Sequence, residues 1–194
     1  MMVFSMHYCK KIKKILFVCL LALFTISGLA ANSSLNIKSA ELAAHEDSYL
    51  LNADVDIKFS NSIEDAIDKG FELNFLIEFQ LATPRKYWFD DEVVTTTHDV
   101  SLSYHALSRQ YLVIRGDQQK TFVRLDEAID DLSTISELKV FQKSELEKGE
   151  LYKAVLLMRL DAKKLPKTLQ SEAMGSEDWK MSSQRYEWVP DIIK

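Results

Sequence analysis

Apolar and polar residues alternate along much of the chain after residue 50, with the period of two that a β-strand requires. Between residues 71 and 81, six apolar residues occupy every second position, and only Leu76 interrupts the polar set between them. A second run, over residues 51–59, alternates in the same way. Side chains two apart in a strand lie on the same face of the sheet. The pattern therefore predicts two strands, each with one buried face.

The segment between these two strands has the features of a short helix. Ser62 is a suitable N-cap, Glu64 and Asp65 lie in the first turn, and Gly70 follows the last turn. Serine oxygens cap free backbone N–H groups, acidic residues favour the positive end of the helix dipole, and glycine favours a helix end. We expect a helix over residues 62–70.

This strand–helix–strand unit has a counterpart 62 residues further along. Residues 63–68 align with residues 125–130, and at the same offset Lys58 aligns with Lys120 and Leu76 with Leu138. A repeat of this size indicates two similar halves that share one core. Two explanations are open at this point: an internal duplication, or the limited number of ways to write a short amphipathic helix with an acidic first turn.

The second half of the sequence predicts further strands. One of them, over residues 151–160, is apolar on both faces, which is typical of an interior strand covered on each side. The last strand is expected over Trp179–Trp188, after an irregular or helical crossover around Leu165-Pro166. The other strands are expected over residues 100–104, 111–115, 120–124 and 138–141, with a hairpin turn at 116–119. The fold class is therefore mainly β: an antiparallel β-sandwich of about eight strands with two short helical crossovers.

The N-terminal 30 residues follow a different pattern. Four lysines between positions 10 and 14 precede an apolar run over residues 15–26, and small residues follow up to Ala31. This order is typical of a secretory signal peptide, and twelve apolar residues are too few to span the hydrocarbon core of a bilayer. We expect residues 1–30 to be a cleaved leader, ending at Ala30 or Ala31, and residues 31–194 to form one exported, periplasmic domain. The alternative is an uncleaved N-terminal anchor in the inner membrane.

Removal of the leader changes the composition. Both cysteines, Cys9 and Cys19, lie within it, so the 164 residues after Ala30 contain no disulfide and no thiol ligand. These residues keep 20 basic and all 29 acidic side chains, a net charge of −9. Nucleic acids and anionic lipid surfaces require a basic face, so the charge argues against both as partners.

The polar residues suggest two arrangements for chemistry, and neither has the required spacing. Ser103 and His105 with the acids at 90–92 resemble the parts of a hydrolase triad, but Ser103 does not lie in a nucleophile elbow. His98 and Asp99 with the same acids match neither a calcium loop nor a helical zinc motif. We therefore predict no catalytic residue, no cofactor and no metal site.

Aromatic residues are the candidates for an interaction surface. Tyr87, Trp88 and Phe89 are consecutive, so on a strand at least one would face away from the core. Such a patch beside mixed charges suits a protein or peptide contact. The competing interpretation, favoured by composition, places Trp88 in the core and Tyr87 at its rim. Trp179 and Trp188 lie nine positions apart, so a regular strand places them on opposite faces, and we expect one of them to line a surface cleft. The predicted interaction surface comprises Tyr87, Trp88, Trp179 and Trp188.

Two arginines lie in apolar, strand-like surroundings. Arg109 and Arg159 would each need a carboxylate partner if they are buried, and Asp90 and Asp161 are the candidates. A structural ion pair is the expected arrangement.

Several motifs together resemble a known family. They lie at residues 85–90, 102–111, 158–161, 165–167 and 178–183. In this order they are similar to the proteobacterial exported family catalogued as domain of unknown function 4390, over roughly residues 36–190. The chain departs from that pattern at Thr168-Leu169 and over residues 171–177. The resemblance implies no activity and no catalytic residue, but genes of this family often lie beside a sensor kinase and a response regulator.

These observations predict an exported envelope protein that is not an enzyme. The first hypothesis is an interaction or sensory-accessory module whose partner is an envelope or membrane protein such as a sensor kinase. The alternative is a periplasmic carrier that holds a small apolar ligand or lipid between the sheets. Contact with the membrane is expected only if the leader is retained.

Overall fold

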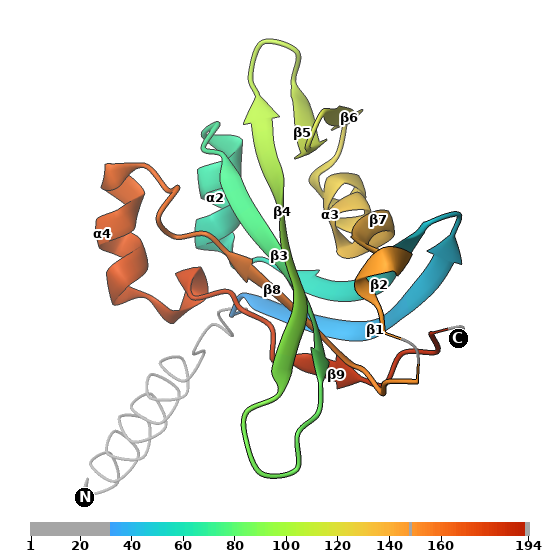
Figure 1. The fold of residues 1–194 in the computed structure, drawn as a ribbon. Helices are drawn as coiled ribbons and strands as arrows, with labels where there is room; N and C mark the ends of the chain where they lie inside the picture. Colours follow the sequence, from blue (N-terminus) through green and yellow to red (C-terminus); the bar gives the residue numbers. More distant parts are fainter. Residues whose placement is uncertain (1–31, 148, 193–194) are drawn as a thin grey trace, which may run out of the picture. The chain divides into compact units, whose positions relative to one another are not determined.

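The computed structural model describes residues 32–147 and 149–192, all within the compact unit Ala31–Lys194. The expected leader, residues 1–30, lies outside the described residues. Figure 1 shows the strands of this unit crossing in two layers with short helices at their connections.

The smaller sheet has three antiparallel strands in the order β1-β2-β7. They are β1 (Ser34–His45), β2 (Ser48–Lys58) and β7 (Thr134–Gln142). The alternation over residues 51–59 is confirmed, because Leu51, Ala53 and Val55 are buried on the inner face of β2. Strand β1 was not predicted, since its burial follows no regular period.

The larger sheet has six antiparallel strands in the order β6-β5-β4-β3-β8-β9. They are β3 (Leu73–Thr83), β4 (Asp91–His105), β5 (Gln110–Arg115), β6 (Gln118–Phe122), β8 (Lys153–Leu160) and β9 (Tyr186–Trp188). The predicted mainly β, antiparallel class is thus confirmed, with nine strands in the described part of the chain. Strand β8 is interior as expected, since β3 and β9 pair with its two sides.

Short helices connect the sheets. Helix α2 (Asn61–Asp68) links β2 to β3 and buries Ile63, Ala66 and Ile67, while α3 (Leu125–Ser133) links β6 to β7 and buries Ala128 and Leu132. Both helices lie in the predicted segments, but the predicted N-cap Ser62 is wrong, because α2 begins at Asn61 and Ser60 is its N-cap. Helix α4 (Lys167–Gly175), the short helix η1 (Lys143–Glu145) and the short helix η2 (Glu177–Trp179) complete the set. No helix in the described ranges is long and apolar enough to cross a membrane.

The two matching segments occupy opposite topological positions. In the first, the chain leaves the three-stranded sheet at β2, passes through α2 and enters the six-stranded sheet at β3. In the second, it leaves the six-stranded sheet at β6, passes through α3 and enters the three-stranded sheet at β7. Ala66 and its counterpart Ala128 are both buried against the core. The two segments therefore cross between the sheets in opposite directions. Strand β2 pairs with β7, whereas β6 lies at a sheet edge beside β5 and not beside β3, so the strand pairing gives no twofold relation between the segments.

Aromatic rings join the two sheets. Phe79 of β3 stacks on Phe141 of β7 at 5.8 Å between ring centroids, and Phe141 stacks on Tyr49 of β2 at 4.9 Å. Phe75 and Phe79 are completely buried. Because aromatic rings bury large apolar areas, these contacts contribute strongly to the cohesion of the core.

The expected last strand, Trp179–Trp188, is wrong over most of its length. Trp179 ends η2, and only Tyr186–Trp188 is a strand. Between them a single bridge joins Arg159 to Ser182, and the Met158 N–H donates to the side chain of Ser183 at 3.1 Å. A side-chain oxygen therefore takes the place of a ladder carbonyl, and regular pairing is lost.

Replacing Phe79 with alanine tests the role of the aromatic contacts. We expect Phe79→Ala to lower the free energy of unfolding by about 3–5 kcal/mol, because it removes a buried ring and leaves a cavity. Urea denaturation measures the change. The exposed Leu107→Ala is the control and should change stability by no more than about 0.5 kcal/mol. A loss below about 1 kcal/mol for Phe79→Ala would show that the sheets are held together elsewhere.

Candidate functional site

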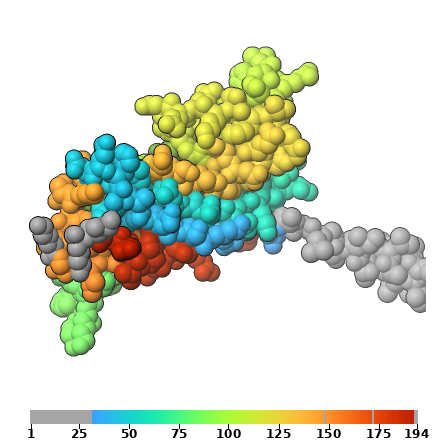
Figure 2. Space-filling view, turned by 90° about the vertical axis from the view of Figure 1, so that its right-hand side faces the viewer, coloured from blue at the N-terminus to red at the C-terminus, as the bar shows by residue number. Residues whose placement is uncertain are grey.

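The loop between β3 and β4 carries the most exposed aromatic residues described. Tyr87, Trp88 and Phe89 are 82%, 80% and 94% exposed. The hairpin extends beyond the rest of the domain in Figure 1, and the same segment projects as light green atoms in Figure 2. The interpretation that placed Trp88 in the core is therefore wrong. Strand pairing ends at Thr83 and resumes at Asp91, so the three residues belong to no strand.

Charged groups close the base of this loop. The Arg85 guanidinium forms an ion pair with Asp91, and its backbone N–H donates to Asp90 Oδ1 at 3.3 Å. Lys153 Nζ of β8 lies 2.5 Å from Asp90 Oδ2 and 3.6 Å from Glu187 Oε2. The Lys153 hydrogen bond, with help from the Arg85 N–H, lowers the pKa of Asp90. The loop is thus fixed at its base while its apex is free of the domain.

A β-bulge lies in β4 just after the loop. Leu81 pairs with Val94 but Ala82 pairs with Glu92, so Val93 is the extra residue in β4. Bulges bend a strand and redirect the side chains next to them. Here the bulge turns Val93 into a pocket beside the loop base.

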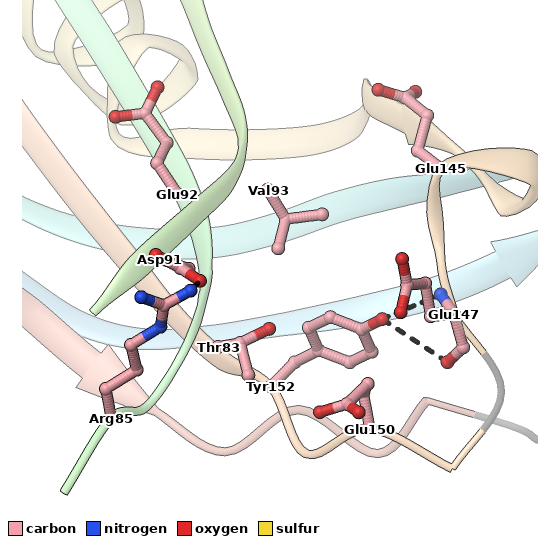
Figure 3. A pocket seen from close by; sticks show the side chains of 9 residues that line it. All are labelled: Thr83, Arg85, Asp91, Glu92, Val93, Glu145, Glu147, Glu150 and Tyr152. Atoms are coloured by element: carbon pink, nitrogen blue, oxygen red, sulfur yellow. Dashed lines mark hydrogen bonds and ion pairs between the residues drawn. The ribbon is translucent and has the colours of Figure 1, made fainter.

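This pocket is strongly acidic. It has a volume of about 530 Å³, and Figure 3 shows its side chains converging from the β3–β4 ends and from residues 145–152. The Tyr152 hydroxyl accepts from the Glu147 N–H at 2.8 Å and donates to its carbonyl at 3.3 Å, which fixes that segment. The lining residues are Thr83, Arg85, Asp91, Glu92, Val93, Glu145, Glu147, Glu150 and Tyr152. The lining holds five carboxylates and one guanidinium, of which Asp91 pairs with Arg85, so the excess of negative charge attracts cationic groups. The described lining contains no acid–base pair around a nucleophile.

The residues considered for a triad are not brought together. His105 is exposed, and its Nδ1 lies 3.0 Å from the Ser108 hydroxyl within the β4–β5 turn. The acids at 90–92 lie at the opposite end of β4, on the order of 40 Å away along a strand that rises about 3.3 Å per residue. Ser103 therefore has no carboxylate–histidine pair of the expected kind beside it.

His98 and Thr96 occupy inner-face positions of β4 that apolar residues would normally fill. They lie opposite Ile77 and Phe79 of β3. His98 Nε2 and Thr96 Oγ1 are buried atoms without a hydrogen-bond partner in the described residues. His98 lines a cleft of about 650 Å³ between β4, the β5–β6 turn and β7. The alternation Val94-Thr96-His98-Val100 was the sequence signal for this position.

Burial lowers the pKa of His98, and the Lys139 backbone and the Asp99 carboxylate offset this only in part. Asp99 itself accepts a hydrogen bond from Lys164 Nζ at 2.6 Å. The acids at 91 and 92 line the separate acidic pocket. Across residues 32–147 and 149–192, no group of three or more histidine, cysteine or acidic side chains is placed to hold a metal.

A second cleft, of about 630 Å³, lies beside α4. Trp179 lines it and is only 2% exposed, so this tryptophan lines a cleft rather than an open surface. Trp188 is half-buried, and its ring lies 6.3 Å from that of Phe79 and 5.7 Å from that of Tyr186. Of the four residues predicted as an interaction surface, Tyr87 and Trp88 are exposed and the two later tryptophans pack against the domain.

The expectations for the two arginines need correction. Arg159 pairs with Glu78 of the neighbouring strand, with Nη2–Oε1 at 2.6 Å, rather than with Asp90 or Asp161. Arg109 lies in the β4–β5 turn at a φ of 54° and is exposed. Because Arg109 lies in an exposed turn, it needs no buried carboxylate partner. The apolar sequence around Arg109 did not predict this turn.

The fold and the site define a two-sheet antiparallel β protein with an exposed aromatic loop between β3 and β4. Residues 32–189 match the family described as Domain of unknown function (DUF4390), and the chain belongs to this family. The match includes all nine strands, the aromatic loop and the cleft beside α4. No curated protein and no solved structure matches the chain.

The lowered pKa of His98 makes a prediction about acid stability. The unfolded chain takes up this proton near its ordinary pKa of about 6.5, whereas the folded chain does so only at lower pH, so His98 makes folding less favourable as pH falls below about 6.5. We expect His98→Gln to show a smaller loss of stability between pH 7 and pH 5 than the original protein. Urea denaturation across this range measures the slope, and the exposed His105→Gln is the matched control. Equal slopes for His98→Gln and the original protein would contradict the prediction.

Proposed function

We propose that this protein is an exported, periplasmic interaction module of the bacterial envelope that acts without catalysis. Its partner is an envelope or membrane protein, such as a sensor kinase, which contacts the tip of the β3–β4 hairpin. The observation that carries the proposal is the exposure of three consecutive aromatic side chains, Tyr87, Trp88 and Phe89, on a projecting hairpin.

The composition of the tip suits a protein contact. Tyrosine and tryptophan are enriched among the few residues that carry most of the binding energy of an interface. Lys86 Nζ lies 5.5 Å from the centroid of the Tyr87 ring, so the aromatic apex also carries a cation. Exposed apolar residues that form a continuous group often mark an interaction site.

The charged residues at the base of the loop also favour a protein contact at its apex. Ion pairs from Arg85 and Lys153 hold the loop at Asp91 and Asp90, so less conformational freedom is lost when a partner binds. A loop that is fixed at its base and free at its apex is suited to insertion into a recess of a partner.

The charge beside the tip favours a protein over an anionic bilayer. The acidic pocket adjoins the loop through Arg85 and Asp91, and negative lipid surfaces repel such a group of carboxylates. A partner that presents basic side chains next to an apolar recess would complement both features.

A second candidate function, a carrier of a small apolar ligand or lipid, is favoured by the cleft beside α4. Its apolar lining includes Leu160, Met174 and Met181. The space between the sheets around Phe75 and Phe79 is filled by side chains, so this cleft is the better place for such a ligand.

Export itself predicts a defined N-terminus. Mass spectrometry of the protein recovered from the envelope fraction of its own cells should find a chain that begins at Ala31, or at Asn32 if cleavage follows Ala31. An intact leader in the membrane fraction would support the anchored alternative. Recovery of the full-length chain from the cytosolic fraction alone would contradict export.

Removal of the aromatic tip tests the interaction. We expect the triple variant Tyr87→Ser, Trp88→Ser, Phe89→Ser to lose the cross-linked partner that the original protein gives in native envelopes, because the contact area at the apex is gone. The double variant Leu107→Ser, Val123→Ser is the matched control, since both residues are exposed apolar side chains away from the tip.

Both variants should fold with nearly unchanged stability, because exposed substitutions usually change it by no more than about 0.5 kcal/mol each. Retention of the partner by the triple variant, or its loss from the control, would count against the tip as the contact site.

A further inference from the structure

The cleft beside α4 has the size and lining of a small-molecule site. Its volume of about 630 Å³ lies within the range of roughly 300–1,000 Å³ that such sites occupy. The cleft is lined by the end of β8, the loop at 161–166, helix α4 and residues 179–182. Leu160, Trp179 and Met181 are buried in its wall, while Met174 of α4 is 78% exposed at its edge.

The described charged groups that line the cleft are all cations. Arg159, Lys163 and Lys180 are among its lining residues, and no carboxylate is among the lining side chains that the structure describes. This is unusual in a domain of net charge −9 and is the reverse of the acidic pocket near the hairpin tip. A cleft with an apolar wall and a cationic edge complements a molecule with an apolar chain and an anionic end.

One of the three cations is available for such an end. Arg159 pairs with Glu78, and Lys180 pairs with Glu177 at 2.7 Å. Lys163 has no ion-pair partner among the side chains described, which are those of residues 32–147, 149–171 and 173–192.

Hydrogen bonds fix the backbone that carries Lys163. Its N–H donates to Asp161 Oδ1 at 3.1 Å, and the Gln170 side-chain amide donates to its carbonyl at 3.2 Å. The same amide donates to the Leu165 carbonyl at 2.7 Å, which ties the loop to α4. The backbone at Lys163 is therefore fixed before any ligand binds, which reduces the entropy lost on binding.

Trp179 forms part of the wall of the cleft. Its side chain is almost fully buried there. Its Nε1–H has no acceptor in the described part of the chain, but this nitrogen is itself buried and is not accessible to a molecule in the cleft.

We propose that this cleft binds a single-chain anionic amphiphile, with its apolar chain against Trp179 and Met181 and its carboxylate at Lys163. The inference rests on the second candidate function, the carrier, and is independent of the aromatic tip. It names the chemical class of the ligand: a fatty-acid-like carboxylate.

Decanoate and 1-decanol have ten-carbon chains but different head groups. Comparing their binding, each below its aggregation concentration, shows whether the cleft requires the carboxylate. Isothermal titration calorimetry should show binding of decanoate that Lys163→Glu weakens by about tenfold or more, the range expected for loss of a charge-assisted hydrogen bond. Lys69→Glu is the matched control, because Lys69 is exposed, forms no ion pair with a described side chain and lies outside the cleft. It should leave the affinity unchanged.

A second pair of variants avoids reliance on one lysine. Met174→Glu places a carboxylate at the edge of the cleft and should weaken decanoate binding, whereas Leu107→Glu, at a side chain that is 92% exposed elsewhere, should not. Both positions are exposed, so both proteins should fold.

The outcomes distinguish the proposed ligand class, an anionic amphiphile, from the broader carrier function. Equal binding of decanol and decanoate, with no effect of Lys163→Glu, would overturn the anionic ligand class and leave the carrier function standing. Binding of neither compound would overturn both. Decanoate binding that survives both cleft variants would place the site elsewhere and overturn the assignment.

Discussion

The stack of Phe79 on Phe141 is the contact on which the rest of the structure depends, because it joins inner strand β3 of one sheet to edge strand β7 of the other, and the two sheets are not hydrogen-bonded to each other by any described strand pair. Sheets that pack face to face are held by interdigitating side chains rather than by backbone pairing. Phe79 lies on β3, the strand that also carries the β3–β4 hairpin and pairs with β8. The position of the exposed tip is therefore set by the same strand that anchors the core.

The helical crossovers cover the core at the open end of the two sheets. A chain that moves from one sheet to the other must pass the open end of the sandwich, where the core would otherwise meet water. Helices α2 and α3 cover this region by burying apolar residues such as Ile63 and Ala128. Their short apolar faces explain why the two segments are so similar in sequence, whether or not the halves arose by duplication.

Sequence alone predicted the parts of the fold in which local pattern and burial agree. The alternation over residues 71–81 identified β3 because each apolar position faces the packed interior. Strand β1 was not predicted, because its pairing with β2 leaves most of its side chains exposed or half-buried and its sequence has no periodic apolar pattern. Trp88 was misplaced because its type favours burial, while the end of pairing at Thr83 depends on tertiary structure. The sequence predicted that Trp179 or Trp188 lines a surface cleft, and Trp179 does, but the rest of the cleft beside α4 was not predicted, since its wall comes from segments that only the folded chain brings together.

Strand β8 relates the two candidate sites to each other. Lys153 at its beginning holds Asp90 at the base of the aromatic loop, and Arg159 near its end lines the cleft. Six residues of extended chain separate them by about 20 Å. Strand β3 pairs with the whole of β8, so one ladder positions both candidate sites. On its other side, β8 pairs with β9 only over Ala154–Leu156, near the aromatic loop. At the cleft, the Arg159–Ser182 bridge takes the place of a full strand, so the wall of the cleft is built from irregular chain where the base of the loop is built from a regular ladder.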